Sequence, residues 1–86
     1  MVEAQLADQL RRAALSISLN IAEGAGEFSP QDKARFYRMA RRSATECAAI
    51  LDAQQSLRLA DEKRITSGRE LLLRIVAMLI RMTKTE

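Results

Sequence analysis

The chain has no histidine and no tryptophan, and its one cysteine is Cys47. Histidine is the side chain that most often serves as a general base or a metal ligand near neutral pH, so its absence removes the commonest route to either site. A single cysteine excludes a disulfide within the chain and a cysteine-based metal cluster. We therefore expect no enzymatic activity, no metal and no cofactor, and a reducing cytoplasm as the location.

Aromatic residues, proline and glycine are also scarce, at three, one and three of 86 residues. A core without them must be built from Leu, Ile, Ala and Met, which favour helices. The richest apolar run, residues 71–80, contains Arg74 and is far shorter than the ~20 residues that cross a membrane. The first ten residues carry acids and no long apolar run, so no signal peptide is readable there. The composition predicts one all-α domain over residues 1–86, outside the membrane.

Capping signals predict three helices, at about residues 3–23, 30–57 and 62–83. Gly24 and Gly26 can take the left-handed conformations that end a helix. Ser29 can cap the second helix, and Pro30 suits its first position because the missing N–H would have no partner there. Asp61 is the candidate cap of the third helix. Because short turns make consecutive helices antiparallel, we expect an up-down helical bundle.

Side chains recur at steps of three and four along the second and third helices, the seam spacing of nearly antiparallel packing. The seam of the second helix comprises Phe36, Ala40, Ser43, Cys47, Ile50, Gln54 and Leu57. The seam of the third comprises Ile65, Gly68, Leu72, Ile75, Leu79 and Met82. Small side chains in the second helix allow a close neighbour. Among them, Cys47 is interpreted as a buried apolar filler and not as a reactive thiol.

The first and third helices carry more apolar surface than one seam uses. On the first helix, Leu10, Ala13 and Ile17 lie on one side at 100° per residue, and a second apolar face lies elsewhere. On the third, nine of the ten residues 71–80 are apolar. The residues beyond the seams are Leu15, Leu19, Ala22, Leu71, Met78 and Ile80. A patch of this size usually marks an interface, so we expect a fourth helix or other subunits to cover it.

Polar side chains line one stripe of the first helix and one stretch of the second. This set comprises Arg12, Ser16, Asn20, Glu23, Ser43 and Glu46. It holds no nucleophile, base and orienting group at a workable spacing for catalysis. We interpret it as a hydrogen-bonded network that fixes the alignment of the helices, with ligand or partner contact as the alternative.

The net charge of +3 is unevenly distributed. Residues 1–28 carry two arginines against four acids, whereas residues 29–57 balance at +2 and residues 58–86 at +3. The basic set comprises Lys33, Arg35, Arg38, Arg41 and Arg42, extended by Arg11 and Arg12. Arginine forks match phosphate geometry, which favours binding to the backbone of RNA or DNA, and few aromatics are available to stack on bases. The alternative is a solvated helix face with Arg42 paired to Glu46.

Three segments carry a family resemblance: QLRRAALSISLNIAEGAG at residues 9–26, the capped turn at 29–32 with Phe36, and ARRSATEC at 40–47. Together they resemble the four-helix-bundle proteins encoded within intervening sequences of bacterial 23S rRNA genes, which are similar to accessory proteins of diversity-generating retroelements. The resemblance spans roughly residues 9–83. It implies an up-down-up-down four-helix bundle, a ring-shaped homopentamer, a basic surface and a nucleic-acid-binding role without enzymatic activity. Family members usually begin with a further helix, so we expect three of the four helices in this chain.

Two functions fit these observations. The first is a non-enzymatic homo-oligomer that binds RNA or DNA through the basic helix face. The alternative is a structural adaptor that docks a protein partner, such as a polymerase, through its apolar helix faces. Reversing the charges of Arg35, Arg38 and Arg42 should abolish the first activity and spare the second.

Overall fold

A computed structural model of the chain describes the backbone of residues 1–84 and the side chains of residues 1–83. Its helices are α1 (Val2–Ala25), α2 (Pro30–Ser56) and α3 (Glu62–Lys84). Within this described part there is no strand. The all-α class is confirmed, and the predicted helix bounds are correct to within one or two residues. No helix in residues 1–84 is long and apolar enough to cross a membrane.

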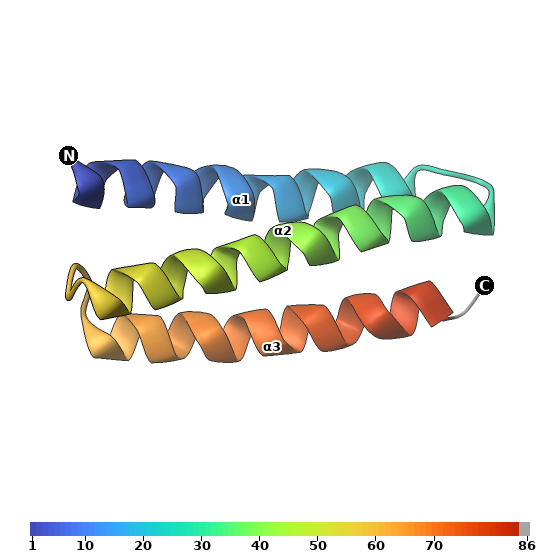
Figure 1. Cartoon of the computed structure of the whole chain (residues 1–86). Coiled ribbons are helices and arrows are strands. Elements are labelled where there is room, and N and C mark those ends of the chain that lie inside the picture. Colours follow the sequence, from blue (N-terminus) through green and yellow to red (C-terminus); the bar gives the residue numbers. More distant parts are fainter. Residues whose placement is uncertain (85–86) are drawn as a thin grey trace.

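The three helices lie side by side, with α2 between α1 and α3 and consecutive helices running in opposite directions (Figure 1). The α2 helix packs against both neighbours. By contrast, no Cα atom of α1 lies within 8 Å of a Cα atom of α3. The Cα atoms extend over 43 × 22 × 13 Å, so the molecule is a flat slab. This arrangement leaves one side of α1 and one side of α3 without a helix against it.

The core is centred on α2, because that helix packs against a neighbour on each of two sides. Its buried residues are Ala34, Tyr37, Ala40, Ala44, Cys47, Ile50, Leu51 and Gln54. The flanking helices contribute fewer fully buried apolar side chains: Ala13 and Ile17 from α1, and Ile65 and Leu79 from α3. Alanine and cysteine at the centre let the helices approach closely, and larger side chains fill the space toward the two ends.

The predicted seam of α2 is correct in its middle and wrong at both ends. Ala40 and Cys47 are buried, as expected. Leu57 follows the last helical residue and is 54% exposed. At the other end, Tyr37 occupies the core while Phe36 is half-buried. The reason is that α2 packs against two helices, so more of its circumference is buried than a seam for one neighbouring helix would bury. A seam for one neighbour therefore places Phe36 in the core in place of Tyr37.

Both predicted helix starts are confirmed. The Ser29 hydroxyl accepts a hydrogen bond from the backbone N–H of Asp32 at 3.4 Å, and Pro30 is the first residue of α2. A carboxylate oxygen of Asp61 accepts from the backbone N–H of Lys63, the second residue of α3, at 3.3 Å. These caps satisfy N–H groups that have no partner within the helix.

The prediction that left-handed glycines end α1 is wrong. Gly24 lies inside the helix, Gly26 caps it with φ −83°, and no glycine in the described chain has a positive φ. Gly24 is needed instead because a Cβ there would lie 2.6 Å from Cε1 of Tyr37. The left-handed residue is Arg58, with φ 55°, just after α2. Its conformation lets the N–H of the next residue bond back to the Gln54 carbonyl at 2.9 Å.

Candidate nucleic-acid interface

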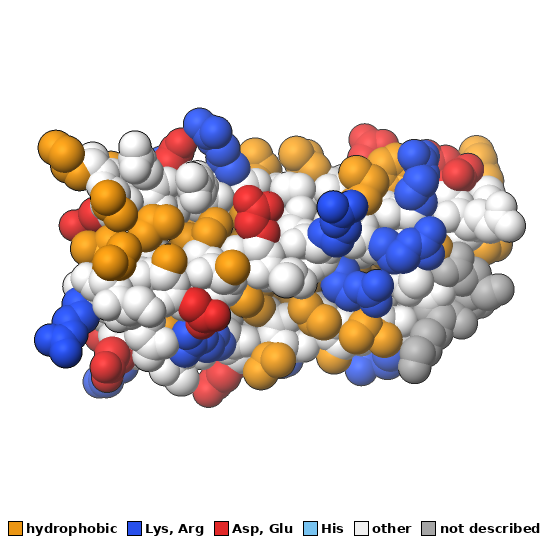
Figure 2. Space-filling model, in the orientation of Figure 1, with side chains coloured by type: hydrophobic (Ala, Val, Ile, Leu, Met, Phe, Trp, Pro, Cys, Tyr) orange, Lys and Arg blue, Asp and Glu red, His pale blue; other side chains and the backbone are white. Residues whose placement is uncertain are grey.

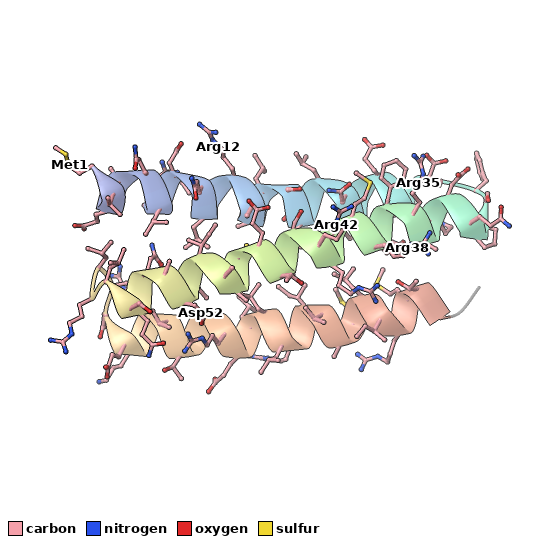
Figure 3. The ribbon with its side chains drawn as sticks, in the orientation of Figure 1. Met1, Arg12, Arg35, Arg38, Arg42 and Asp52 are labelled. Carbon is pink, nitrogen blue, oxygen red and sulfur yellow. The ribbon has the colours of Figure 1, made fainter. Side chains whose placement is uncertain are left out.

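Three arginines form a row along the first half of α2. Arg35, Arg38 and Arg42 are all exposed and project from the face turned toward the viewer in Figure 3. Their spacing of three and four residues places them on one side of the helix over ~10 Å. In Figure 2, Lys and Arg side chains gather over this end of the same face. We call Arg35, Arg38 and Arg42 the basic stripe.

None of the three arginines is paired with an acid in the described chain. Arg42 and Glu46 line the same shallow depression, but they form no ion pair, so the predicted i+4 pairing is not seen. The guanidinium of Arg35 stands 4.7 Å from the centre of the Phe36 ring, which favours one position of that charge without neutralising it. The stripe therefore presents three positive charges to solvent.

The structure gives other contacts to the rest of the predicted basic set. The Lys33 ammonium donates to the carbonyls of Gly24 and Ala25 at 3.4 and 3.3 Å, so it caps the end of α1. Arg11 and Arg12 both pair with Asp8 on α1, at 3.0 and 2.9 Å. Arg41 is half-buried beside the stripe. The sequence marked these residues as basic, but it could not show which charges would be shared with a helix end or a carboxylate.

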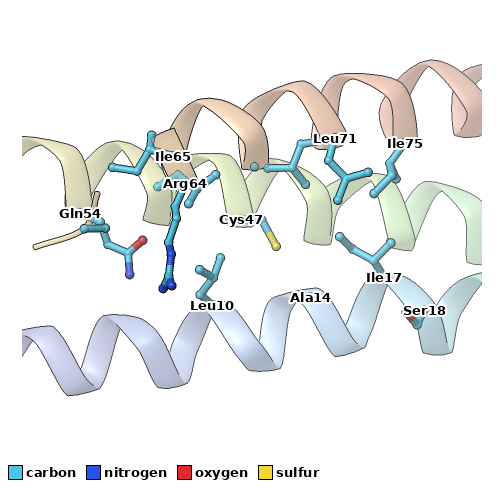
Figure 4. A pocket seen from close by; sticks show the side chains of 14 residues that line it. Leu10, Ala14, Ile17, Ser18, Cys47, Gln54, Arg64, Ile65, Leu71 and Ile75 are labelled. Atoms are coloured by element: carbon cyan, nitrogen blue, oxygen red, sulfur yellow. The ribbon is translucent and has the colours of Figure 1, made fainter. Parts of the chain in front are cut away.

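An apolar groove lies on the opposite face of the molecule, between α1 and α3. Its volume is about 560 Å³, and its floor is formed by Cys47, Leu51 and Gln54 of α2 (Figure 4). At 100° per residue, these three residues point about 150° away from the basic stripe around the axis of α2. The basic stripe and the apolar groove thus lie on opposite faces of the slab.

A polar contact joins α1 to α2 next to the stripe. The hydroxyl oxygens of Ser16 and Ser43 lie 2.7 Å apart, and the Asn20 amide donates to the Ser16 carbonyl and hydroxyl at 2.9 and 3.2 Å. The other members of the predicted network, Arg12, Glu23 and Glu46, take no part in these bonds in the described chain. The three remaining side chains satisfy one another, which agrees with a role in helix alignment.

Removing either serine hydroxyl should weaken this contact. We expect Ser16→Ala and Ser43→Ala each to lower the free energy of unfolding by about 0.5–1.5 kcal/mol, because each leaves a part-buried hydroxyl without its partner. The double variant should cost less than the sum by about 1 kcal/mol, measured by urea denaturation as a double-mutant cycle. Ser67→Ala, at an exposed serine of α3, is the control. Strict additivity would contradict a direct contact between the two hydroxyls.

The remaining sequence predictions concern Cys47 and the apolar faces. Cys47 is buried, and burial, reinforced by the negative charge of Glu46, raises the pKa of its thiol. A thiol with a raised pKa is a poor nucleophile, in keeping with an apolar filler.

Of the predicted interface residues, Leu15, Leu19, Ala22, Leu71 and Met78 are exposed and Ile80 is half-buried. No group of three potential metal ligands occurs among the residues that the structure describes.

Comparison with known protein families gives a match over nearly the whole described chain. No curated protein and no solved structure matches the chain. The model of the 23S rRNA-intervening sequence protein family matches residues 2–81, which include all of α2 and nearly all of α1 and α3. The matched region contains the segments at residues 9–26 and 40–47 on which the resemblance rests. The chain therefore belongs to the 23S rRNA-intervening sequence protein family.

Proposed function

We propose that this chain is a non-enzymatic protein that binds the phosphate backbone of RNA or DNA through the basic stripe. One observation carries the proposal: three exposed arginines stand in a row without acidic partners, on the face opposite the apolar groove. A face of this kind remains free to bind a polyanion even when the groove is covered. The hydroxyls that might have served a reaction, Ser16 and Ser43, are instead bonded to each other.

The spacing of the stripe suits consecutive phosphates. Three arginines spread over ~10 Å can reach neighbouring phosphates of one backbone strand, because each long side chain can direct its guanidinium group toward a different phosphate. Guanidinium groups bind phosphate oxygens through two parallel hydrogen bonds. Within the stripe, stacking on bases has little support, because Tyr37 is buried and Phe36 lies half-buried beneath Arg35. The exposed aromatic ring of Phe28 lies in the turn before α2, outside the stripe. We therefore propose binding by charge and backbone geometry, without sequence specificity.

Self-association would strengthen such binding. The resemblance implies a homopentamer of four-helix subunits, and any closed assembly that leaves the basic faces outward repeats the stripe once per copy. Linked sites raise the effective concentration of each for one nucleic acid, so weak contacts sum to strong binding. We propose that the protein acts as a homo-oligomer in the cytoplasm.

The apolar groove supports the adaptor function as a second candidate, because a groove of about 560 Å³ between two helices could hold an apolar helix of another protein. The two functions use opposite faces. A variant that changes only the basic stripe therefore separates them.

Reversing the three charges should abolish nucleic-acid binding. We would titrate structured RNA and duplex DNA with Arg35→Glu/Arg38→Glu/Arg42→Glu at two salt concentrations. The affinity of the wild-type protein should fall steeply as the salt concentration rises. The slope of log K against log salt concentration counts the phosphate contacts, and in the variant this slope should be smaller by about three contacts per chain. The matched control, Arg58→Glu/Lys63→Glu/Arg74→Glu, makes the same change in net charge at exposed positions outside the stripe. Equal losses in both variants, or wild-type binding independent of salt, would refute the proposal.

A further inference from the structure

One aromatic ring of the chain is fully exposed. Phe28, in the turn between α1 and α2, is 99% exposed, whereas Tyr37 is buried and Phe36 is half-buried. Such exposure leaves the whole apolar surface of the ring in water, which costs free energy that no packing within the described chain recovers. Both faces of the ring are therefore available to stack against a flat partner.

The ring lies at the end of the molecule where the basic stripe begins. The turn between α1 and α2 is at one end of the slab (Figure 1), and Arg35 is the stripe residue nearest to this turn in the chain (Figure 3). Phe28 precedes Pro30, the first residue of α2, by two positions, and Arg35 follows it by five. Their Cα atoms are therefore within roughly 16 Å of each other. Because an arginine side chain is long, one short stretch of a strand can contact both the ring and the guanidinium group.

Two acids close to the ring in the chain decide what it can hold. Glu27 precedes Phe28 and is half-buried, and Asp32 is exposed in the first turn of α2. Their charges repel a phosphate group but not an uncharged base. At 100° per residue, Asp32 points about 90° away from the basic stripe around the axis of α2. The ring is therefore suited to a base, and the phosphates are drawn toward the arginines.

A shallow depression lies at the other end of the stripe. Its volume is about 340 Å³, and it is lined by Ser16, Asn20, Met39, Arg42, Ser43 and Glu46. Met39 is 43% exposed and supplies apolar surface. The amide nitrogen of Asn20 donates to Ser16, but neither its oxygen nor the Glu46 carboxylate accepts a hydrogen bond within the described chain. The depression thus offers an apolar contact for the face of a base and free acceptors for the N–H groups on its edge.

A duplex can use neither contact along its length. Bases that are stacked and paired within a duplex present neither their flat faces nor their Watson–Crick edges to a protein. In an unpaired strand both are free, and aromatic side chains beside a basic track are the usual means of binding such strands. The ring, the stripe and the depression together therefore match an unpaired strand.

We propose that the nucleic acid bound by the basic stripe is single-stranded, with one base stacked on Phe28 and another base in the depression beyond Arg42. This inference rests on the proposed nucleic-acid binding and specifies its substrate. The strand follows α2 over the ~18 Å between Pro30 and Arg42, with its phosphates on the three arginines. Because every base has a flat face, stacking of this kind does not select a sequence.

The relative affinities of a single strand and a duplex test the proposal. The full chain would be titrated, by fluorescence anisotropy at one salt concentration, with oligouridylate, oligothymidylate and an A·T duplex, each ~12 nucleotides long. A duplex has the higher charge density, so binding by charge alone would favour it. We expect at least one of the two single strands to bind about tenfold more tightly than the duplex, and a difference between them would identify the preferred sugar. Equal or tighter binding of the duplex would overturn the proposal.

Removing the ring should weaken only the binding of single strands. We expect Phe28→Ala to lower the affinity for oligothymidylate about tenfold, the usual effect of losing one stacked base, and to leave the duplex affinity unchanged. Leu57→Ala is the matched control, because Leu57 is a 54% exposed apolar residue at the opposite end of α2. Equal losses for the two variants, or equal losses of Phe28→Ala on single strand and duplex, would refute stacking on the ring.

A methionine variant tests the second base contact. Met39→Ala should lower the affinity for oligothymidylate several-fold without changing the duplex affinity. Met78→Ala, at a methionine of α3 that is 36% exposed and does not line the depression, should change neither. If Met39→Ala and Met78→Ala have the same effect, no base occupies the depression.

Fluorescence reports stacking directly. The chain contains no tryptophan, so Phe28→Trp introduces a single indole at the position of the ring. This variant should bind oligothymidylate at least as tightly as the wild type, because indole is a larger stacking surface. Its emission should be quenched when oligothymidylate is added and should stay unchanged with the duplex. Emission that ignores the single strand, or that responds equally to the duplex, would contradict stacking at position 28.

The outcomes distinguish this inference from the proposed function. If single strand and duplex bind equally and Phe28→Ala changes neither, backbone binding stands and the single-strand inference is wrong. If no nucleic acid binds in a salt-dependent way, the proposed function is wrong and this inference falls with it. Light scattering should give the same mass for Phe28→Ala and the wild type. A change in mass would mean that the ring joins copies of the chain, which would also overturn the inference.

Discussion

Replacing Leu79 with alanine should lower the free energy of unfolding by about 2–5 kcal/mol, the usual range for a leucine truncated in a packed core. Leu79 is one of the two largest fully buried side chains, at 0% exposure, and it packs in the main core cluster with Tyr37 and Ala40. Alanine at this position leaves a cavity that three nearly straight helices cannot close without shifting along one another. Because small domains are stable by only about 5–15 kcal/mol, this single change removes a large share of the total.

Urea denaturation followed by circular dichroism would measure the loss, at one protein concentration so that any self-association contributes equally. Leu73→Ala is the matched control, since it removes the same atoms from an exposed position of the same helix. It should change the free energy of unfolding by no more than about 0.5 kcal/mol. Similar losses for the two variants would mean that Leu79 does not lie in a packed core.

The helices themselves could be predicted from the sequence. Ser29, Pro30 and Asp61 mark helix starts through local chemistry, and local chemistry does not depend on the rest of the fold. The central seam positions Ala40 and Cys47 follow from a spacing of three and four residues. These predictions succeeded because each needs only the neighbouring few residues.

The errors arose where distant segments meet. Gly24 was expected to bend the chain, but its use is to leave room for the ring of Tyr37, which lies thirteen positions away. Tyr37 was not expected in the core, because a seam drawn for one neighbour is too narrow for a helix with two. Arg58 was not expected in a left-handed conformation, since no glycine marks that turn. None of these roles has a local signal in the sequence.

The candidate site shows the same division. The basic cluster on α2 is visible in the sequence, and so is the row of Arg35, Arg38 and Arg42. What the sequence does not show is that Lys33 is held by the carbonyls at the end of α1. It also does not show that the apolar groove faces away from the stripe. The opposition of the two faces comes from α2 being the middle helix, and that position was not predicted.

The basic stripe and the apolar groove lie on opposite faces, which explains how a single layer of three helices can carry two different binding surfaces. The groove side of α2 carries small and apolar side chains, so another helix can approach it. The far side carries the arginines, whose charges would be costly to bury without partners. A partner helix that enters the groove leaves the arginines in water, and a polyanion bound to the arginines leaves the groove untouched. Variants in one surface should therefore leave the other's binding unchanged.

Two glycine variants should change stability in opposite directions. Gly24 lies in α1, where alanine is normally favoured over glycine by about 1 kcal/mol. Here, however, the new Cβ would lie 2.6 and 2.9 Å from two ring atoms of Tyr37 and 3.2 Å from Cβ of Phe36. The ring is buried in the core and cannot turn away freely. We expect Gly24→Ala to lower the free energy of unfolding by about 1–3 kcal/mol, as overpacked core positions do.

Gly26 is two residues further on and has no such neighbour. A Cβ there would lie 3.6 Å from the Glu23 carbonyl oxygen, an ordinary contact, and its φ of −83° suits any residue. Gly26→Ala should raise the free energy of unfolding by about 0.4–1 kcal/mol, because alanine restricts the unfolded chain. A Gly24→Ala/Tyr37→Leu variant should lose less than the sum of its single changes, since leucine removes the ring atoms nearest the new Cβ. If both glycine variants gained stability, the close approach of α1 and α2 at Tyr37 would be wrong.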